Sequence, residues 1–189
     1  MDCLEGILKR RSIRKFTDEN IKEEELEALL NSAISAPSPH NEQPWEFLIL
    51  KEKHIIEKLA SKLKEEYIKS GKADEEKAEM TYRIVSSAKV ILIGFLNTKK
   101  LRSDSHNERL MGMQSLAAAA ENVLIAANCL GLGAHWRAIP LVRPDIFSDM
   151  FRIPDYVEPQ WMILLGRPGA LPKPKYLQKE GVFHFNGWA

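Results

Sequence analysis

The densest group of chemically useful side chains lies close to the N-terminus, in residues 9–15. Its members are Lys9, Arg10, Arg11, Ser12, Arg14 and Lys15. Alternate side chains of an extended segment point to one side, so Arg10, Ser12 and Arg14 would share a face. A guanidinium binds an oxyanion through two parallel hydrogen bonds, and a hydroxyl adds a further donor. The segment therefore predicts a phosphate site, with a solvated basic surface as the alternative.

A second group occupies the loop over residues 36–45. Pro37 and Pro39 prevent a helix from continuing and stiffen the chain. Ser38 and Asn41 add side chains that form directional hydrogen bonds. The loop is either a rigid part of a binding site or an ordinary connector between a helix and a strand.

A third group follows the glycines Gly131 and Gly133. The pair lacks a third glycine and follows a predicted helix instead of opening one, so it is a poor dinucleotide-binding fingerprint. The glycines instead indicate a turn into a strand. That strand carries unusually bulky polar side chains for a small core, namely His135, Trp136 and Arg137.

Several other kinds of site are not indicated by the sequence. The histidines are scattered and none has a Cys or His partner at metal-ligand spacing: His40, His54, His106, His135 and His184. Cys3 and Cys129 form no disulfide framework and lack the context of a nucleophile. There is no nucleophile elbow and no Walker loop. A net charge of +1 gives no overall basic field for nucleic acid.

The elements expected from the sequence place these groups at the ends of helices and strands. Hydrophobic periodicity predicts helices over 2–11, 22–35, 52–69, 109–130 and 145–151. Apolar and β-branched runs predict strands over 45–50, 88–96, 134–139 and 160–166, an edge strand at 183–185 and an extended piece over 13–16. Helices and strands are interspersed without strict alternation, which indicates an α+β fold in one domain spanning residues 1–189.

Composition and termini narrow the class of protein further. Apolar residues make up 44% and charged residues 28% of 189 residues, an ordinary globular balance. The segment Met1–Glu5 is acidic and lacks the apolar core of a signal peptide, and no uninterrupted apolar run reaches membrane-spanning length. These features predict a cytoplasmic protein. The alanine-rich helix over 109–130 would pack against its own sheet, against its copy in a second subunit, or against both.

The three groups together resemble the motifs of the nitroreductase family of FMN-dependent oxidoreductases, in the same order and at the same spacing. Residues 10–16 are similar to the family's opening Arg-x-Ser-x-Arg/Lys motif, and residues 36–45 to its Ala-Pro-Ser-x-x-Asn-x-Gln-Pro-Trp loop. Residues 131–137 resemble its third flavin-contacting segment, and residues 172–175 its basic Pro-Lys-Pro-Arg closing element. The match covers nearly the whole chain.

The resemblance implies a fold and a cofactor site. The fold is a central mixed, mainly antiparallel sheet flanked by helices, in an interlocked homodimer with two FMN sites at the interface. The implied cofactor-binding residues are Arg10, Arg11, Ser12, Arg14, Pro37, Ser38, Asn41, His135, Trp136, Arg137 and Lys175. Arg10, Ser12 and Lys175 would hold the phosphate end, and Arg14 would lie near the pyrimidine edge of the flavin. Pro37, Ser38 and Asn41 would come from the other subunit, and residues 135–137 would line the isoalloxazine.

Two positions depart from the family motifs. Pro39 stands where a second serine is common and removes a hydroxyl and a backbone donor from the loop. Lys175 stands where arginine is common. It replaces the planar guanidinium, which can form two parallel hydrogen bonds, by a compact ammonium charge. Segments 64–82 and 97–109 would roof the pocket. Their candidate substrate contacts are Tyr67, Tyr82, Arg102, His106 and Arg109.

The implied activity is an NAD(P)H-dependent reduction of small planar acceptors, such as nitroaromatics or quinones, by a ping-pong hydride mechanism. NADH or NADPH would be the electron donor. The flavin performs the redox chemistry, so no catalytic side chain and no metal are expected. Alternatives are a specialised relative that acts as a dehalogenase or fragments flavin, and a flavin-binding redox sensor without turnover.

Overall fold

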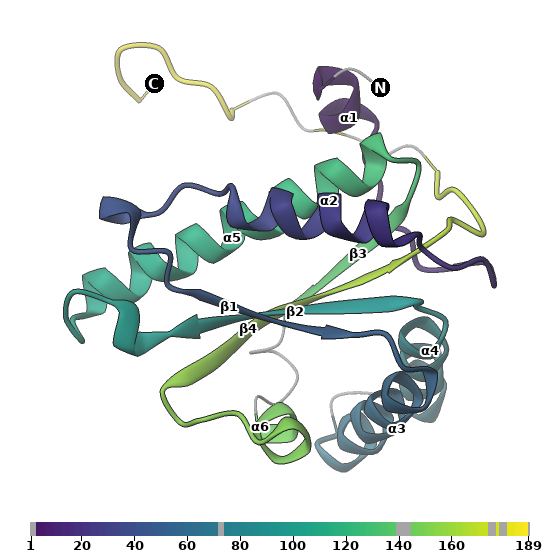
Figure 1. Cartoon of the computed structure of the whole chain (residues 1–189). Helices are drawn as coiled ribbons and strands as arrows, with labels where there is room; N and C mark the ends of the chain where they lie inside the picture. Colours follow the sequence, from purple (N-terminus) through teal and green to yellow (C-terminus); the bar gives the residue numbers. More distant parts are fainter. Residues whose placement is uncertain (1–2, 72–73, 139–144, 174–176, 178–180, 189) are drawn as a thin grey trace.

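A four-stranded sheet lies between two layers of helices (Figure 1). The computed structural model describes residues 3–71, 74–138, 145–173, 177 and 181–188. The strands are β1 (Trp45–Leu50), β2 (Val90–Asn97), β3 (Gly133–Ala138) and β4 (Val157–Gly166). The helices are α1 (Cys3–Lys9), α2 (Glu23–Ile34), α3 (Lys53–Lys69), α4 (Glu75–Ser86), α5 (His106–Cys129) and α6 (Asp145–Phe151). Two short 3₁₀ turns, η1 (Pro39–Asn41) and η2 (Thr98–Lys100), complete the described elements.

The order of strands in the sheet is β1-β2-β4-β3, and every pair of neighbours is antiparallel. The predicted α+β class is therefore confirmed. The parallel pairing that the structure describes is a single bridge between Ser12 and Ala134, at the edge formed by β3. The chain returns to this edge after α1, which brings the basic segment beside β3.

Two hydrophobic cores lie on the two faces of the sheet, because β2 alternates its side chains between them. Leu92 and Leu96 face the upper core under α2 and α5, whereas Ile91 and Ile93 face the lower core over α3 and α6. All residues of β2 are buried, since helices cover both faces. β1 is only partly buried, and the side chain of Glu46 on this edge strand is exposed.

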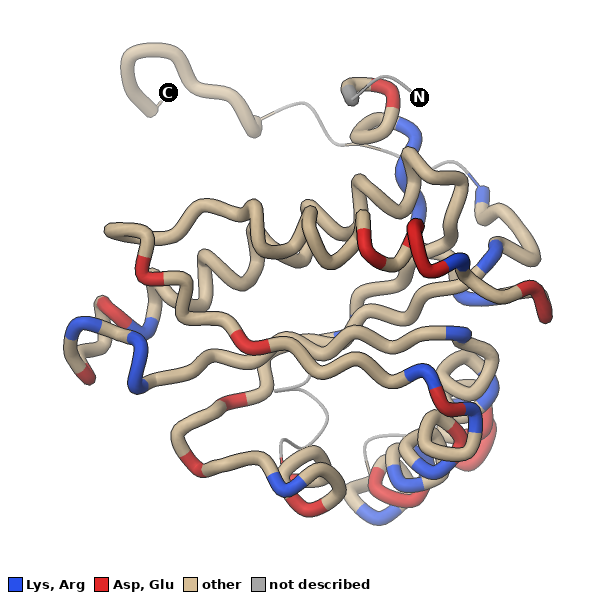
Figure 2. Tube along the Cα trace, in the orientation of Figure 1, with Lys and Arg blue, Asp and Glu red and all other residues tan. Residues whose placement is uncertain are grey.

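Helix α5 is long and apolar enough, by length and composition, to cross a membrane. In this fold it instead covers the upper face of the sheet, where Leu116, Ala119, Ala120 and Val123 have no exposed surface. Its trace is almost free of charged residues, in contrast to α3 and α4 (Figure 2). The hydrophobic run therefore belongs to a core helix, and its small side chains allow close packing on the strands.

The structure differs from the expected secondary structure at two places. Residues 75–86 form α4, a helix that hydrophobic periodicity did not predict; Asp74 caps this helix by accepting a hydrogen bond from the backbone N–H of Lys77 at 2.8 Å. The predicted edge strand at 183–185 is not a strand in the described part of the tail. No neighbouring strand pairs with it there, and His184 stacks on Trp188 at 4.2 Å instead.

Candidate functional site

The basic segment is anchored on the sheet by Ile13. This side chain is 4% exposed, and its backbone N–H donates to the carbonyl of Ala134 at 2.9 Å. Gly133 makes the approach possible, because a Cβ atom there would lie 2.8 Å from Cγ2 of Ile13. A close backbone approach of this kind requires glycine. Burial of Ile13 turns the neighbouring side chains, Ser12 and Arg14, away from the core.

A second anchor follows at Phe16, which is buried against Gly166. A Cβ at Gly166 would lie 2.9 Å from the ring, so the absence of a side chain there leaves room for Phe16. Gly166 lies directly opposite Gly133 in the sheet. Arg167 then ties the segment to the start of α2. Its guanidinium pairs with Glu19 and Glu25 at 2.9 Å each, and its carbonyl accepts from the N–H of Thr17 at 3.0 Å. Sequence reasoning identified neither Gly166 nor Arg167, since their roles depend on partners distant in sequence.

Three cationic or titratable side chains lie near enough to interact electrostatically beside β3: Arg14, His135 and Arg137. His135 and Arg137 point to the same face because they are two residues apart in a strand. His135 is 8% exposed, and its Nδ1 has no hydrogen-bond partner among the described residues. Burial, followed by the positive charges of Arg14 and Arg137, lowers the pKa of His135 to about 4. The imidazole is therefore neutral at physiological pH, and the cluster holds two guanidinium charges.

No carboxylate neutralises this cluster among the residues that the structure describes. Arg14 has no ion pair there, and the buried Nε of Arg137 has no hydrogen-bond partner. The Nη2 of Arg137 donates to Tyr67 Oη at 3.4 Å, which brings α3 to the same place. Buried donors without partners are costly, so the cluster is suited to a ligand with anionic or carbonyl oxygens.

The buried histidine predicts a pH dependence of stability. The unfolded chain binds a proton at His135 near pH 6.5, whereas the folded chain does so only near pH 4. Stability is therefore full above pH 6.5 and is lost as the pH falls toward 4, by about 3 kcal/mol in the free energy of unfolding. Denaturant unfolding of ligand-free protein at fixed concentration measures this loss. A His135→Leu variant should lack it, and parallel pH curves for the two proteins would contradict the prediction.

The remaining predicted residues near this cluster are placed differently. Trp136 points to the opposite face of β3, where it contacts Trp161 in the upper core with ring centroids 6.4 Å apart. Arg11 turns back and donates to the carbonyls of Leu8 and Arg10. These two side chains thus do not join Arg14 and His135. Lys175 lies outside the described residues.

Arg10 has a partner that sequence reasoning missed. Its Nε lies 3.2 Å from Oε1 of Glu121 in α5, and both side chains remain partly exposed. Glu121 and Arg10 are far apart in sequence, so only the packing of α1 on α5 reveals the pair. Exposed ion pairs contribute little to stability, so Arg10 is free to exchange this partner for a ligand.

The loop at residues 36–45 is built from unusual backbone. His40, Asn41 and Gln43 have positive φ angles of 50°, 58° and 49°. Side chains other than glycine and asparagine rarely adopt this conformation, and it costs on the order of 1–3 kcal/mol per residue. Ser38 stabilises the turn, because its Oγ accepts a hydrogen bond from the N–H of Gln43 at 3.0 Å. The loop is a rigid structure with exposed polar side chains, as expected of a binding element.

The loop and the cationic cluster lie at opposite ends of the molecule. Pro37, Ser38 and Pro39 line a hollow of about 220 Å³ together with residues 111–118 of α5. The basic segment instead meets β3, which begins after the other end of this 24-residue helix. The 11 to 18 residues between this part of α5 and its last residue, Cys129, span about 17 to 27 Å of helix. One chain therefore does not bring the two groups together.

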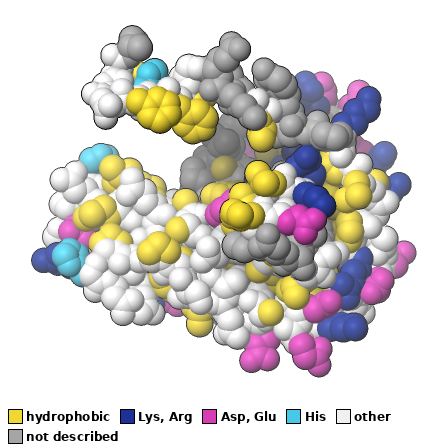
Figure 3. Space-filling model, turned by 90° about the horizontal axis from the view of Figure 1, so that it is seen from above, with side chains coloured by type: hydrophobic (Ala, Val, Ile, Leu, Met, Phe, Trp, Pro, Cys, Tyr) yellow, Lys and Arg dark blue, Asp and Glu magenta, His cyan; other side chains and the backbone are white. Residues whose placement is uncertain are grey.

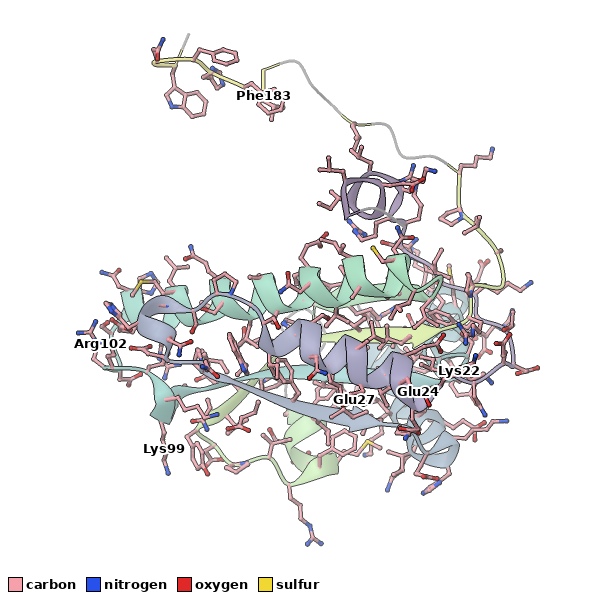
Figure 4. The ribbon with its side chains drawn as sticks, turned by 45° about the horizontal axis from the view of Figure 1, so that its top comes forward. Lys22, Glu24, Glu27, Lys99, Arg102 and Phe183 are labelled. Atoms are coloured by element: carbon pink, nitrogen blue, oxygen red, sulfur yellow. The ribbon has the colours of Figure 1, made fainter. Side chains whose placement is uncertain are left out.

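Figure 4 shows the same separation through labelled side chains. Arg102, whose Nε lies 3.8 Å from Glu42, marks the end that holds the loop. Lys22 marks the opposite end, where its backbone N–H donates to the Glu25 carboxylate that also pairs with Arg167. A site that uses both groups needs a second copy of the chain.

The predicted roof segments divide between these two ends. Tyr67 contacts Arg137 in the cluster, and Tyr82 lies half-buried in the lower core beside Lys64. At the other end, Arg109 is occupied by Asp104 at 2.7 Å and Glu158 at 2.5 Å. At the same end, Arg102 pairs with Glu42, and His106 is the exposed first residue of α5.

A larger cavity lies elsewhere. It has about 850 Å³, lies between α3 and α4 and is lined mostly by charged side chains. Glu79 pairs there with Lys64 at 2.6 Å and Arg83 at 3.2 Å. None of the predicted cofactor residues lines it. Its lining carries charges of both signs, in contrast to that of the Arg14–Arg137 cluster.

Comparison with known proteins gives consistent matches along the chain. A sequence profile described as "Nitroreductase family" matches residues 7–167. A protein of Methanothermobacter thermautotrophicus, provisionally named an NADH dehydrogenase/NAD(P)H nitroreductase, is 31% identical over 100% of this chain and 88% of its own length. The FMN reductase (NADPH) of Bacillus subtilis is 27% identical over 98% of this chain and 74% of its own length.

The fold is shared with solved structures as well. A provisionally named nitroreductase from Desulfovibrio desulfuricans, solved in complex with FMN, has a TM-score of 0.79 and 24% identity. The match covers 100% of this chain and 99% of that one. The architecture described above is therefore found throughout the length of a flavin-containing protein.

Proposed function

Because the chain belongs to the nitroreductase family of FMN- and NAD(P)H-linked oxidoreductases, we propose that it binds FMN between two subunits and reduces small planar acceptors, such as nitroaromatics or quinones. The observation that carries the proposal is the unneutralised pair Arg14 and Arg137 around the buried His135. FMN presents a phosphate and ring carbonyls, which are acceptors for these donors. The relatives that are named for FMN and NADPH support the same cofactor and donor.

The residues of the chain have distinct tasks in this proposal. Arg10 and Ser12 bind the phosphate end, together with Lys175. Arg14 and Arg137 place positive charge beside the isoalloxazine, which stabilises negative charge that develops there on reduction. His135 remains a neutral polar neighbour. When bound, FMN supplies the two-electron chemistry between NAD(P)H and the acceptor, so the protein needs to bind, orient and exclude water.

The second subunit supplies Pro37, Ser38 and Asn41. This assignment is supported by the separation of the loop from the cluster, which a single chain does not overcome. The described tail supports a dimer as well, because Phe183, Phe185 and Trp188 are 72%, 89% and 89% exposed. Phe183 lies well away from the helical layers in Figure 4. Hydrophobic side chains gather on the tail in Figure 3. Burial of such surface against a partner is favourable.

A mixed-dimer experiment tests the shared site. Arg14→Glu and Asn41→Asp should each weaken FMN binding about 10- to 100-fold in a homodimer, so that each variant purifies with little bound FMN. A heterodimer of the two variants keeps one intact site, built from the unmutated Arg14 of one chain and the unmutated Asn41 of the other. Co-expression with two affinity tags and a flavin absorption spectrum should therefore show about half of the wild-type FMN per dimer. No recovery of FMN would place both residues in sites within one chain and overturn the shared arrangement.

The activity is tested by anaerobic reduction. Purified protein should be yellow, and NADH or NADPH should bleach the flavin within the dead time or the first seconds of stopped-flow mixing. Addition of a quinone or a nitroaromatic should then restore the oxidised spectrum. Slow reduction by both nicotinamides would identify a flavin-binding sensor, and a protein that binds no added FMN would refute the proposal. We further propose that residues 1–189 act as one domain in the cytoplasm.

A further inference from the structure

Within the 36–45 loop, the amide of Asn41 has a fixed partner. Gln43 Nε2 donates to Asn41 Oδ1 at 3.0 Å. The contact leaves the Asn41 Nδ2 group with no hydrogen-bond partner among the residues that the structure describes. An amide presents a donor on one side and an acceptor on the other, so occupation of the oxygen determines which group faces outward.

The backbone holds both side chains in this relation. The N–H of Asn41 donates to the Ser38 carbonyl at 3.1 Å, and the N–H of Gln43 donates to Ser38 Oγ at 3.0 Å. The left-handed conformations of Asn41 and Gln43 then direct the two side chains. Both are exposed in the single chain, so their mutual hydrogen bond is not a packing contact of the core.

We propose that Gln43 is a positioning residue that turns the Asn41 amide so that its NH₂ group donates to a ring carbonyl of the flavin bound by the partner subunit. The inference deepens the proposed function and rests on it. The edge of an isoalloxazine offers carbonyl oxygens as acceptors and one N–H as a donor. An NH₂ donor in a fixed position favours the ring position in which a carbonyl oxygen faces the loop. It disfavours the position in which the ring N–H faces the loop, because two donors would then meet.

Two isosteric substitutions reverse the polarity of this contact. In Gln43→Glu the carboxylate has no donor for Asn41 Oδ1 and instead accepts from Nδ2, which turns the oxygen toward the ligand. In Asn41→Asp an oxygen faces the ligand directly. Both changes place an acceptor against an acceptor. Gln43→Met removes the partner without adding charge and leaves the amide free to rotate.

The experiment measures FMN binding to full-length apoprotein by quenching of FMN fluorescence. Gln43→Glu and Asn41→Asp should weaken binding about 10- to 100-fold, and Gln43→Met by less. Gln114→Glu is the matched control, because this exposed residue of α5 lies beside the same loop and gains the same charge without touching the Asn41 amide. It should bind FMN as the wild type does.

A spectroscopic measurement separates positioning from a structural effect. The carbonyl stretching band of bound FMN, read by infrared difference spectroscopy at saturating FMN, should move to higher frequency in Gln43→Glu and Gln43→Met, because a hydrogen bond to the carbonyl is lost. An unchanged band and unchanged affinity in both variants would overturn the inference. If Gln43→Glu disturbs the dimer, the carbonyl band of FMN bound to Gln43→Met is the measurement that tests the inference. Failure of the wild type to bind FMN would instead refute the proposed function.

Discussion

Replacing Arg14 by glutamate is expected to weaken FMN binding about 100-fold while leaving the fold intact. Arg14 is exposed and has no ion pair among the described residues, so its charge is available to a ligand. Reversal of a charge that faces an anionic partner typically costs a few kcal/mol, and 100-fold corresponds to about 2.7 kcal/mol. Fluorescence titration of the apoprotein with FMN measures the change. The melting temperature should stay within a few degrees of the wild type, because the side chain packs against no core.

The neighbouring residue supplies the control for Arg14. Lys15 is also exposed, and in the extended segment its side chain points to the other side of the backbone. Lys15→Glu produces the same change in net charge and should leave FMN affinity nearly unchanged at physiological ionic strength. If the two variants bind FMN equally well, Arg14 has no specific place in the site. If both lose FMN equally, a general basic field attracts the cofactor instead of the Arg14–Arg137 cluster.

The largest expected loss of stability follows the change Trp161→Ala. Trp161 is 2% exposed, and its indole N–H donates to the Leu116 carbonyl at 3.0 Å. Gly94 on β2 leaves the space for the ring, since a Cβ there would lie 2.4 Å from it. Truncation of such a side chain costs about 4 kcal/mol through lost burial and the cavity that remains. The melting temperature should fall by roughly 10 °C at fixed protein concentration.

A conservative variant separates the parts of that loss. Trp161→Phe keeps an aromatic ring in the same space but loses the hydrogen bond, so its cost should be about half as large. The contact with Trp136 at 6.4 Å also links this residue to β3. A cost below about 1 kcal/mol for Trp161→Ala would show that the upper core relaxes around the missing ring. Calorimetry of the ligand-free proteins measures both variants.

Several parts of the fold were accessible from local sequence patterns. Continuous apolar runs gave β1 over residues 45–50 with the observed bounds, and hydrophobic periodicity gave α6 over 145–151. These signals depend on residues adjacent in the chain. Helix α4 was missed because its buried positions, Ala78, Thr81 and Val85, are too small or polar to stand out among charged neighbours. Its stability comes from packing on α3, which no local pattern contains.

The candidate site shows the same division between local and tertiary information. The basic segment predicted that Arg10, Ser12 and Arg14 would share a face, but the structure gives Arg10 a partner in α5 and places Arg14 beside His135. Trp136 was grouped with its neighbours in sequence, yet strand alternation sends it to the other core. Side-chain direction in a strand follows from residue parity once the strand is placed, and placement depends on the whole sheet.

The sequence by itself determined the chemistry that the basic segment can perform: its order of cations and hydroxyl indicated an oxyanion site, and the set of motifs indicated the nitroreductase family. Residue types determine charge and hydrogen-bonding capacity, so these properties are local. Only the tertiary structure decided which charges remain unneutralised. It brought Glu121 to Arg10, left Arg14 and Arg137 without an ion pair among the described residues, and separated the 36–45 loop from them. Neutralisation depends on distances through space, which are set by the packing of α5 and the sheet.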